Sequence, residues 1–252
     1  MSDRFSMQGK NAIITGGTRG IGLAIARGFV EAGATVTVCG RKPEGAESAA
    51  AELDAPDRVL AVAAHVGKSD DVDRLISQAE DRFGPVNVVV NNAGTNPYYG
   101  PIIDSEEWAF DKTMDVNLRA PYVLSLRLAR KMVEGSGGSI LNISSVAGLT
   151  ASRNQGIYSV SKAALIMLTK VMAREMGRGG VRVNCILPGL IKTQLSRELW
   201  ENPERAKAAA ERKALGRLGE TDELVGAAVY FCSEAGSFTT GAVLQVDGGL
   251  VI

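Results

Sequence analysis

Residues 11–22 have the sequence Asn-Ala-Ile-Ile-Thr-Gly-Gly-Thr-Arg-Gly-Ile-Gly, an apolar run that ends in a glycine-rich turn. Glycines allow a tight turn and let a phosphate approach the backbone N–H groups, while the N-terminus of a following helix supplies partial positive charge. A glycine cluster alone is often only a loop, but between a strand and a helix it indicates a dinucleotide site. The spacing is Gly-x-x-x-Gly-x-Gly rather than the commoner Gly-x-Gly-x-x-Gly.

Outward from this stretch, short apolar runs alternate with longer helical patterns. The runs are nearly continuous, which is typical of strands buried on both faces of a parallel sheet. The predicted strands are Asn11–Thr15, Thr35–Cys39, Arg58–Ala64, Val86–Asn91, Gly138–Ser144, Val181–Ile186 and Ala242–Val246. The predicted helices are Gly22–Ala32, Ser69–Arg82, Glu106–Glu134, Gly156–Met176 and Asp222–Cys232. This alternation predicts an α/β fold, with residues 1–252 forming one Rossmann-like, doubly wound domain around a seven-stranded parallel sheet.

Two local features qualify this pattern. The helix at Ser69–Arg82 opens with Ser-Asp-Asp, which predicts an N-terminal cap by Ser69 and favourable acids in the first turn. The polar segment Thr193–Leu215, within an insertion at about 190–215, is rich in charge and alanine. It is either a surface ornament or a lid over a cleft.

Charge and composition exclude several classes of function. Lys plus Arg and Asp plus Glu both number 28, so we expect neither nucleic acid nor an anionic membrane as a partner, because both require a basic face. The apolar runs are shorter than a membrane span, and we expect no secretory signal at the N-terminus and no peroxisomal signal at the C-terminus. Few cysteines and the single histidine, His65, predict core thiols in a reducing, cytoplasmic compartment and no metal site.

Tyr158 and Lys162 lie one helical turn apart in the run Gly-Ile-Tyr-Ser-Val-Ser-Lys. Positions i and i+4 of a helix share a face, so we expect the ammonium to lower the pKa of the phenol. Such a phenol could exchange a proton with a carbonyl oxygen. Taken alone, the spacing is more typical of an exposed pair on an ordinary helix.

The end of the second predicted strand bears on the choice of cofactor. An acid at this place binds the ribose hydroxyls of NAD, but the chain has Val38-Cys39-Gly40-Arg41-Lys42 with no carboxylate. Arg41, together with Arg19 in the glycine turn, suits a 2′-phosphate by charge and bidentate geometry. The sequence therefore favours NADP(H), with a solvated turn as the alternative.

Seven pieces of the chain together resemble the classical short-chain dehydrogenase/reductase family. In order they are Thr15–Gly22, Asn91-Asn-Ala-Gly94, Asn117, Ser145, Tyr158-x-x-x-Lys162, Pro188-Gly189 and Val246-Asp-Gly-Gly249. The resemblance implies that Tyr158 is the general acid or base and that Lys162 lowers its pKa and binds the nicotinamide ribose. It also implies that Ser145, rather than its neighbour Ser144, stabilises charge on the substrate oxygen, and that Asn117 holds a water that relays protons.

The resemblance also assigns the dinucleotide site. The implied cofactor-binding residues, besides Tyr158 and Lys162, are Gly16, Thr18, Arg19, Gly20, Ile21, Gly22, Arg41, His65, Val66, Asn91, Ala93, Gly94, Pro188, Gly189, Ile191 and Thr193. One of them departs from the family, which usually has Asp where this chain has His65. An adenine contact and a surface-loop position are equally open for that histidine.

The substrate is less closely defined. The segments expected to shape the pocket are Thr95–Ile103, Gly148–Gln155 and Leu190–Trp200, with the candidate substrate residues Asn96, Tyr98, Gln155, Leu195 and Trp200. Their apolar and aromatic character favours hydrophobic ketones, and the chain also resembles tetrameric carbonyl reductases. The leading interpretation is an NADPH-dependent ketone reductase, reversible as an alcohol dehydrogenase.

Two alternative functions remain open beside the ketone reductase. A 3-oxoacyl-thioester reductase would need basic residues at the cleft mouth, for which Arg153 and Arg197 are available. A non-catalytic dinucleotide sensor is disfavoured, since the four catalytic residues are intact.

The resemblance implies a homotetramer formed through Glu106–Glu134, Gly156–Met176 and the C-terminal strand. An apolar stripe in the second helix supports it, comprising Ala163, Ala164, Met167, Leu168, Val171 and Met172.

Overall fold

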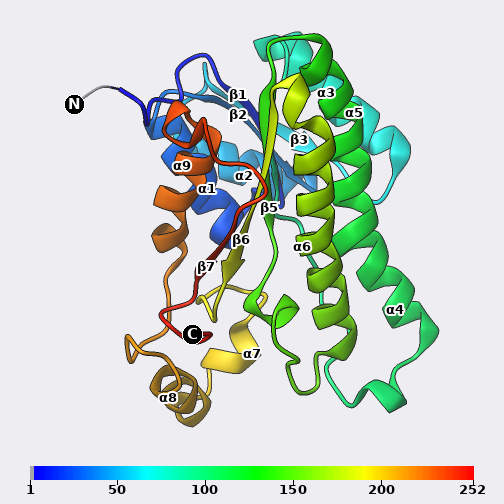
Figure 1. Ribbon diagram of the computed structural model, residues 1–252, viewed down its shortest axis with the longest axis vertical. Helices are drawn as coiled ribbons and strands as arrows, with labels where there is room; N and C mark the ends of the chain where they lie inside the picture. The colour runs from blue at the N-terminus through cyan, green and yellow to red at the C-terminus, as the bar shows by residue number, and fades with distance from the viewer. Residues whose placement is uncertain (1–2) are drawn as a thin grey trace.

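All the strands of residues 3–252 belong to one parallel sheet. They are β1 (Asn11–Thr15), β2 (Thr35–Gly40), β3 (Val59–Ala63), β4 (Val88–Asn91), β5 (Gly138–Ile143), β6 (Val181–Pro188) and β7 (Val243–Val246). In the computed structural model, which describes residues 3–252, their order is β3-β2-β1-β4-β5-β6-β7 (Figure 1). The chain runs outward from β1 to β3 and returns to pair β4 with the other side of β1. The predicted fold class and all seven predicted strands are confirmed, with shifts of up to two residues at their ends.

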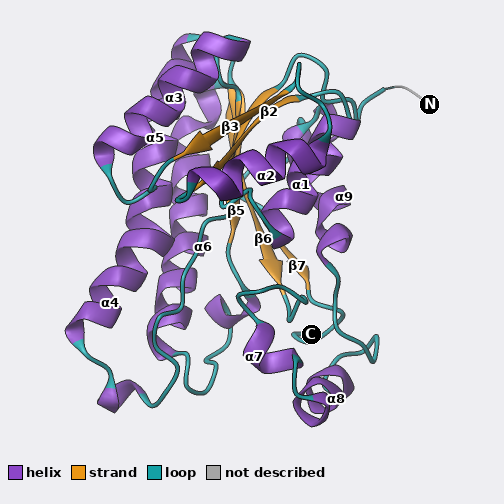
Figure 2. Ribbon diagram, turned by 180° about the vertical axis from the view of Figure 1, so that it is seen from behind, coloured by secondary structure: helices purple, strands orange, loops and turns teal. Residues whose placement is uncertain are grey.

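Helices cover both faces of this sheet (Figure 2). They are α1 (Gly20–Glu31), α2 (Pro43–Leu53), α3 (Ser69–Phe83), α4 (Glu107–Met114), α5 (Ala120–Glu134), α6 (Gly156–Met176), α7 (Arg197–Trp200), α8 (Pro203–Glu211) and α9 (Val225–Cys232). One buried cluster joins α1, α2 and α9 to the sheet, and another joins α3, α5 and α6 to its other face. Along β1, Ala12 and Ile14 enter the first cluster and Ile13 the second, as expected for a strand buried on both faces.

Several expectations about the helices need correction. The helix expected over Asp222–Cys232 begins as a 3₁₀ turn at Thr221–Leu224, and α9 starts only at Val225. The helix α2 was not predicted, because its alanine-rich sequence has only a weak apolar face. The helix expected over Glu106–Glu134 is divided by a π-helical turn at Asp115–Arg119, and α1 begins two residues before its expected start. Ser69 does not cap α3: the N-cap is Lys68, with no side-chain bond. The Ser69 hydroxyl instead accepts a hydrogen bond from Arg127 at 2.8 Å.

The helix α6 carries Tyr158 and Lys162. Within residues 3–252, the stretch Gly156–Gly179 is the one helical segment long and apolar enough to cross a bilayer, with a mean hydropathy of 1.2. Its apolar side chains have another explanation, because Leu165, Ile166 and Met172 are buried in contact with the rest of the chain. The three cysteines, Cys39, Cys185 and Cys232, are likewise buried and free.

Candidate active site

The glycine turn packs against the end of β4 without room for side chains. A Cβ on Gly22 would lie 2.4 Å from both the Asn92 amide nitrogen and the Gly16 carbonyl oxygen. A Cβ on Gly16, where φ is +62°, would lie 3.0 Å from the Cα of Ala93. The backbone of the turn therefore approaches β4 as closely as it can. This close approach explains the glycines and leaves the N–H groups at the start of α1 uncovered by side chains.

Asn92 holds this arrangement in place. Its side-chain amide donates to the carbonyls of Thr15 and Gly16, both at 3.0 Å. In return, the Thr15 hydroxyl accepts from the backbone N–H groups of Asn92 and Ala93, both at 3.1 Å. No role is predicted for Asn92 from the sequence, although it is the second residue of Asn-Asn-Ala-Gly. Its neighbour Asn91 was expected to line the adenosine site instead.

The Asn91 side chain is not free to line that site. Asn91 is 2% exposed, and its amide donates to the Ser125 hydroxyl and to the Asn142 side-chain oxygen, both at 2.8 Å. Strand alternation turns the Asn91 side chain into the core and leaves only its backbone for a ligand. Ala93 and Gly94, which follow the strand, remain available beside the glycine turn.

The start of α1 has the character of an anion site. Its N-cap is Arg19, with extended backbone, and no side chain caps the helix. Thr18 packs over the end of β2, where a Cβ on Gly40 would lie 2.5 Å from its methyl group. Ile21, half-buried, packs against the core below. The first backbone N–H groups of α1 therefore point toward any ligand bound in the glycine turn.

Arg19 and Arg41 supply positive charge at this end of the site. Both side chains are exposed. Over residues 3–252, no salt bridge or side-chain hydrogen bond occupies either guanidinium group. The two cations are therefore free to bind an anionic group beyond the end of β2.

His65 and Val66 follow β3 at the same edge of the sheet. The backbone N–H of His65 donates to Asp71 at 2.8 Å, and its Nδ1 accepts from the N–H of Gly67 at 3.1 Å. Burial, followed by the charges of Lys112 and Arg41, lowers the pKa of His65. The ring is therefore a neutral, fixed part of this turn, and its contact with adenine stays a prediction. Val66 is half-buried against the core.

Tyr158, Lys162 and Ser145 meet at the carboxyl end of β5. Lys162 is 4% exposed, and its Nζ donates to the Ile143 carbonyl at 2.9 Å. The same Nζ lies 5.6 Å from the centroid of the Tyr158 ring. Ser144 donates its hydroxyl to the Lys162 carbonyl at 2.8 Å, which ties it to the helix. The Ser145 side chain is half-buried and is not tied to the helix in this way, and its role toward a substrate stays a prediction.

The expected lowering of the Tyr158 pKa is not found for this chain. Burial raises the pKa of Tyr158 above its ordinary value, and the Ser145 hydroxyl acts in the opposite direction. The ammonium does not offset this burial: it lies 5.6 Å from the ring centroid and donates its hydrogen bond to the Ile143 carbonyl. Burial also lowers the pKa of Lys162 to about 8. The phenol is thus held in its protonated, proton-donating form.

Asn117 links these residues to the loop after β4. It is fully buried in the π-helical turn, and its Oδ1 accepts from the Thr95 N–H at 2.8 Å. Its Nδ2 donates to the Thr95 carbonyl at 2.9 Å and to the Ser161 hydroxyl at 3.0 Å. A Cβ on Gly94 would lie 3.6 Å from both Asn117 Oδ1 and Lys162 Nζ. Both Nδ2 hydrogens of Asn117 are used in these two bonds. A water held by Asn117 would therefore have to donate to one of the oxygen atoms of Asn117.

The segment after β6 reaches back to the glycine turn. Pro188 ends the strand, and a Cβ on Gly189 would lie 2.7 Å from the Cα of Asp247. Ile191 is buried. A Cβ added to Gly20 would lie 3.4 Å from the methyl carbon of Thr193. Chain segments far apart in sequence therefore close around the start of α1.

The five candidate substrate residues are placed differently from one another. The Tyr98 hydroxyl donates to the Pro101 carbonyl at 2.8 Å, and the Trp200 indole N–H donates to the Thr193 carbonyl at 3.1 Å. Leu195 is 60% exposed. Gln155 lies at the N-cap of α6, and Asn96 is half-buried in the loop after β4.

Comparison with known proteins places this site in a family. A family model described as "Enoyl-(Acyl carrier protein) reductase" matches residues 16–251. "Dehydrogenase/reductase SDR family member 4" of Homo sapiens is 39% identical over 250 residues, covering 99% of this chain and 90% of the human protein.

Solved structures agree in fold and in sequence. A gluconate 5-dehydrogenase from Burkholderia cenocepacia, in complex with NADP and tartrate, has a TM-score of 0.93 and 35% identity, covering 98% of this chain and 97% of its own. A short-chain type dehydrogenase/reductase from Mycobacterium marinum has a TM-score of 0.92 and 32% identity, covering 99% and 98%.

Proposed function

Since the chain belongs to the short-chain dehydrogenase/reductase family and is an oxidoreductase, we propose that it interconverts a hydrophobic ketone and its secondary alcohol with NADP(H). The observation that carries this proposal is the meeting of Ser145, Tyr158 and Lys162 at the same sheet edge as the glycine turn. A proton donor and a hydroxyl for the carbonyl oxygen then stand beside the dinucleotide site.

The residues at the dinucleotide end fit an NADP(H) molecule. The glycine turn forms a cradle that a Cβ at Gly16 or Gly22 would fill, which suits a pyrophosphate close to backbone N–H groups. The free guanidinium groups of Arg19 and Arg41 suit a 2′-phosphate. When bound, the cofactor supplies or accepts the hydride. NADP in the related Burkholderia cenocepacia enzyme gives further support.

The chain's own residues would carry the proton chemistry. Tyr158, kept protonated by burial, would donate to the carbonyl oxygen during reduction. The Ser145 hydroxyl would stabilise the negative charge developing on that oxygen. Lys162 would hold the ribose and place positive charge near the phenol. Asn117 fixes Gly94 and Thr95 next to the ammonium.

The apolar residues near the cleft support a hydrophobic substrate. Tyr99 is 51% exposed, Leu149 is 46% exposed and Leu195 is 60% exposed. We further propose that residues 190–215, with α7 and α8, act as a lid beyond the ends of β6 and β7 (Figure 1). The approach of Thr193 to Gly20 supports a lid rather than a surface ornament.

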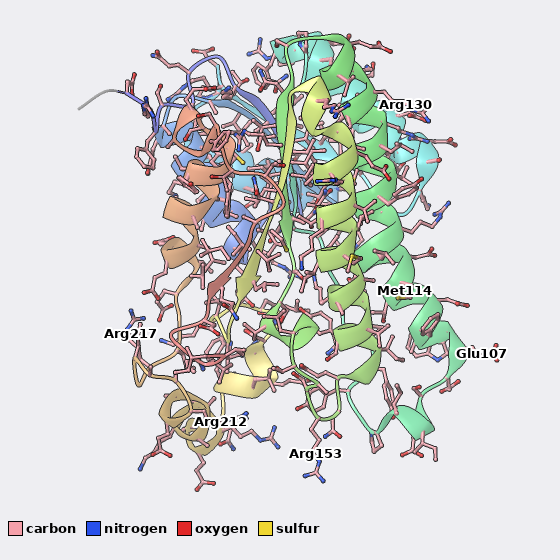
Figure 3. All side chains as sticks on the ribbon, in the orientation of Figure 1. Glu107, Met114, Arg130, Arg153, Arg212 and Arg217 are labelled. Atoms are coloured by element: carbon pink, nitrogen blue, oxygen red, sulfur yellow. The ribbon has the colours of Figure 1, made fainter. Side chains whose placement is uncertain are left out.

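One observation favours the 3-oxoacyl-thioester alternative. Arg153 points outward from the loop before α6 and is free to meet an acidic carrier (Figure 3). Arg197 is less available, because it is paired with Glu201 at 2.6 Å. The description of the matching family model also names an acyl carrier protein.

The test is NADPH oxidation with a panel of carbonyl compounds. We expect the highest kcat/KM for aryl ketones and α-diketones, lower values for acetoacetyl thioesters, and the lowest for 5-ketogluconate. Preference for the thioester would favour the alternative. Loss of turnover with every compound, with NADPH still bound, would favour the non-catalytic sensor.

We also propose a homotetramer. On α6, Met167 is 58% exposed and Val171 42% exposed, and Val160 extends this stripe. Met172, expected in the same stripe, is instead buried in the chain's own core. Trp108 on α4 adds a large exposed aromatic surface. Burying these side chains against a second copy would remove them from water. Light scattering should give four times the 26.5 kDa of one chain, and a monomeric mass would refute the assembly.

A further inference from the structure

The loop 95–101, which follows β4, is bound at both ends to the start of α6. At its first residue, Thr95 pairs with Asn117 through two hydrogen bonds of 2.8 and 2.9 Å. Asn117 also donates to the Ser161 hydroxyl, which in turn donates to the Tyr158 carbonyl at 2.7 Å. The loop is thereby connected to the helical turn that carries the proton donor.

The other end of the loop meets the segment just before α6. The Gly100 N–H donates to the Asn154 carbonyl at 3.0 Å, and Gly100 forms an isolated parallel bridge with Gln155. Gln155 is the N-cap of α6, and its carbonyl accepts from Ser159 at 2.8 Å. This Gly100–Asn154 link therefore lies four residues before Tyr158.

Both partners of the link have restricted backbones. Asn154 has φ of +64°, one of two non-glycine residues with positive φ among residues 3–252. Asparagine tolerates this left-handed conformation far better than alanine does. At Gly100, a Cβ would lie 2.6 Å from the Tyr98 hydroxyl oxygen. The Tyr98 ring folds over Gly100 to reach the Pro101 carbonyl, so the loop is also closed upon itself.

We propose that Asn154 is a positioning residue which, through Gly100, fixes the distance between the loop 95–101 and Tyr158 and so limits the size of the carbonyl substrate. The loop forms one side of the entrance to the reacting atoms, because Gly94 and Thr95 stand next to Lys162 and Asn117. A wall that is bound to the catalytic helix cannot move aside for a bulkier ketone. The substrate part of this inference rests on the proposed function.

The test compares Asn154→Ala with Asn154→Gly. Glycine keeps the positive φ and the carbonyl that Gly100 needs, whereas alanine is strained there. The probes are 2,3-butanedione and benzil, a small and a bulky α-diketone. We expect Asn154→Ala to raise kcat/KM for benzil relative to butanedione by about tenfold, while the glycine variant stays within about twofold of wild type.

A second measurement is independent of turnover. Hydrogen exchange at the Gly100 amide should quicken in Asn154→Ala and not in Asn154→Gly, while amides of α6 beyond Lys162 stay protected. The dissociation constant for NADPH should not change. General destabilisation would instead quicken exchange throughout and lower kcat/KM equally for both diketones.

Gly100→Ala disturbs the same link from its other side, because the new Cβ displaces Tyr98. It should also raise the ratio of kcat/KM for benzil to kcat/KM for butanedione. Equal ratios in the alanine and glycine variants of Asn154 would overturn the specificity role. Unchanged exchange at Gly100 would overturn the link itself. If wild type reduces no carbonyl compound, the proposed function fails, and the exchange measurement still decides whether the link holds the loop.

Discussion

The dinucleotide end of the cleft and its substrate end are built in opposite ways. Around the glycine turn, backbone packs on backbone, and a Cβ at Gly22 would lie 2.4 Å from its neighbours. At the substrate end, side chains such as Tyr99 and Leu195 are more than half exposed. The first end has no room for an added side chain, whereas the exposed side chains at the second end can be exchanged without displacing a neighbour. We therefore expect substitutions to abolish function at the first end and to alter selectivity at the second.

Tyr158→Phe tests the point where the two ends meet and should have the largest effect. The ring and its packing remain, but the proton donor is lost, so kcat should fall by about 10²- to 10⁴-fold. Binding of NADPH, measured by fluorescence titration, should change by no more than about twofold. A kcat within a few-fold of wild type would contradict the role of the phenol.

Gly22→Ala tests whether the dinucleotide end is as crowded as the structure indicates. The added Cβ has no space beside Asn92 and Gly16, so we expect a loss of about 1–3 kcal/mol in the free energy of unfolding and at least tenfold weaker NADPH binding. The matched control is Gly45→Ala in α2, where nothing lies within 4 Å of the new Cβ. The control should be neutral or stabilising by about 0.5–1 kcal/mol, as urea denaturation can measure.

Arg41→Asp changes charge at the dinucleotide end without touching the substrate end. We expect the ratio of kcat/KM for NADPH to that for NADH to fall by roughly 10- to 100-fold, because a charge-assisted hydrogen bond is lost and a repelling carboxylate is gained. The KM for the ketone should stay the same. Arg178→Asp, a similar charge change on a remote exposed residue, serves as the control. A wild-type preference for NADH would refute our assignment of the cofactor.

Lys162 should produce the smallest effect, a change of stability with pH. Its pKa is lowered to about 8 in the folded chain, so between pH 8 and its unfolded value the unfolded chain binds more protons at this residue. Stability should therefore rise with pH over this window, by on the order of 1–3 kcal/mol in total. The difference in unfolding free energy between wild type and Lys162→Met, measured from pH 8 to 9.5, isolates this contribution. Parallel curves for the two proteins would contradict it.

The same contrast explains what could be predicted from sequence. The strands and the glycine turn were found because burial on both faces and close backbone contact each require a narrow set of residues. The helix α2 was missed, since its alanines are compatible with many structures. The π-helical turn at Asp115–Arg119 could not be predicted, because it does not change the spacing of apolar residues along the sequence.

Within the site, the sequence indicated which residues come together but not the hydrogen bonds that hold them in place. Lys162 was placed beside Tyr158, but the Ile143 carbonyl that receives its ammonium lies 19 residues away in sequence. Asn92 and Ser161 were not given roles, because their hydrogen bonds depend on contacts between distant segments. For the same reason, the sequence could not show that Asn91 turns its side chain inward.

The burial of all three cysteines has a practical consequence. Burial raises the pKa of Cys39 to about 12, of Cys185 to about 11 and of Cys232 to about 12. Because alkylating reagents attack the thiolate, these native side chains should resist maleimide dyes at neutral pH. A cysteine substituted for the exposed Leu195 would then be labelled alone. A fluorophore attached there would test whether the segment 190–215 opens and closes as the proposed lid requires.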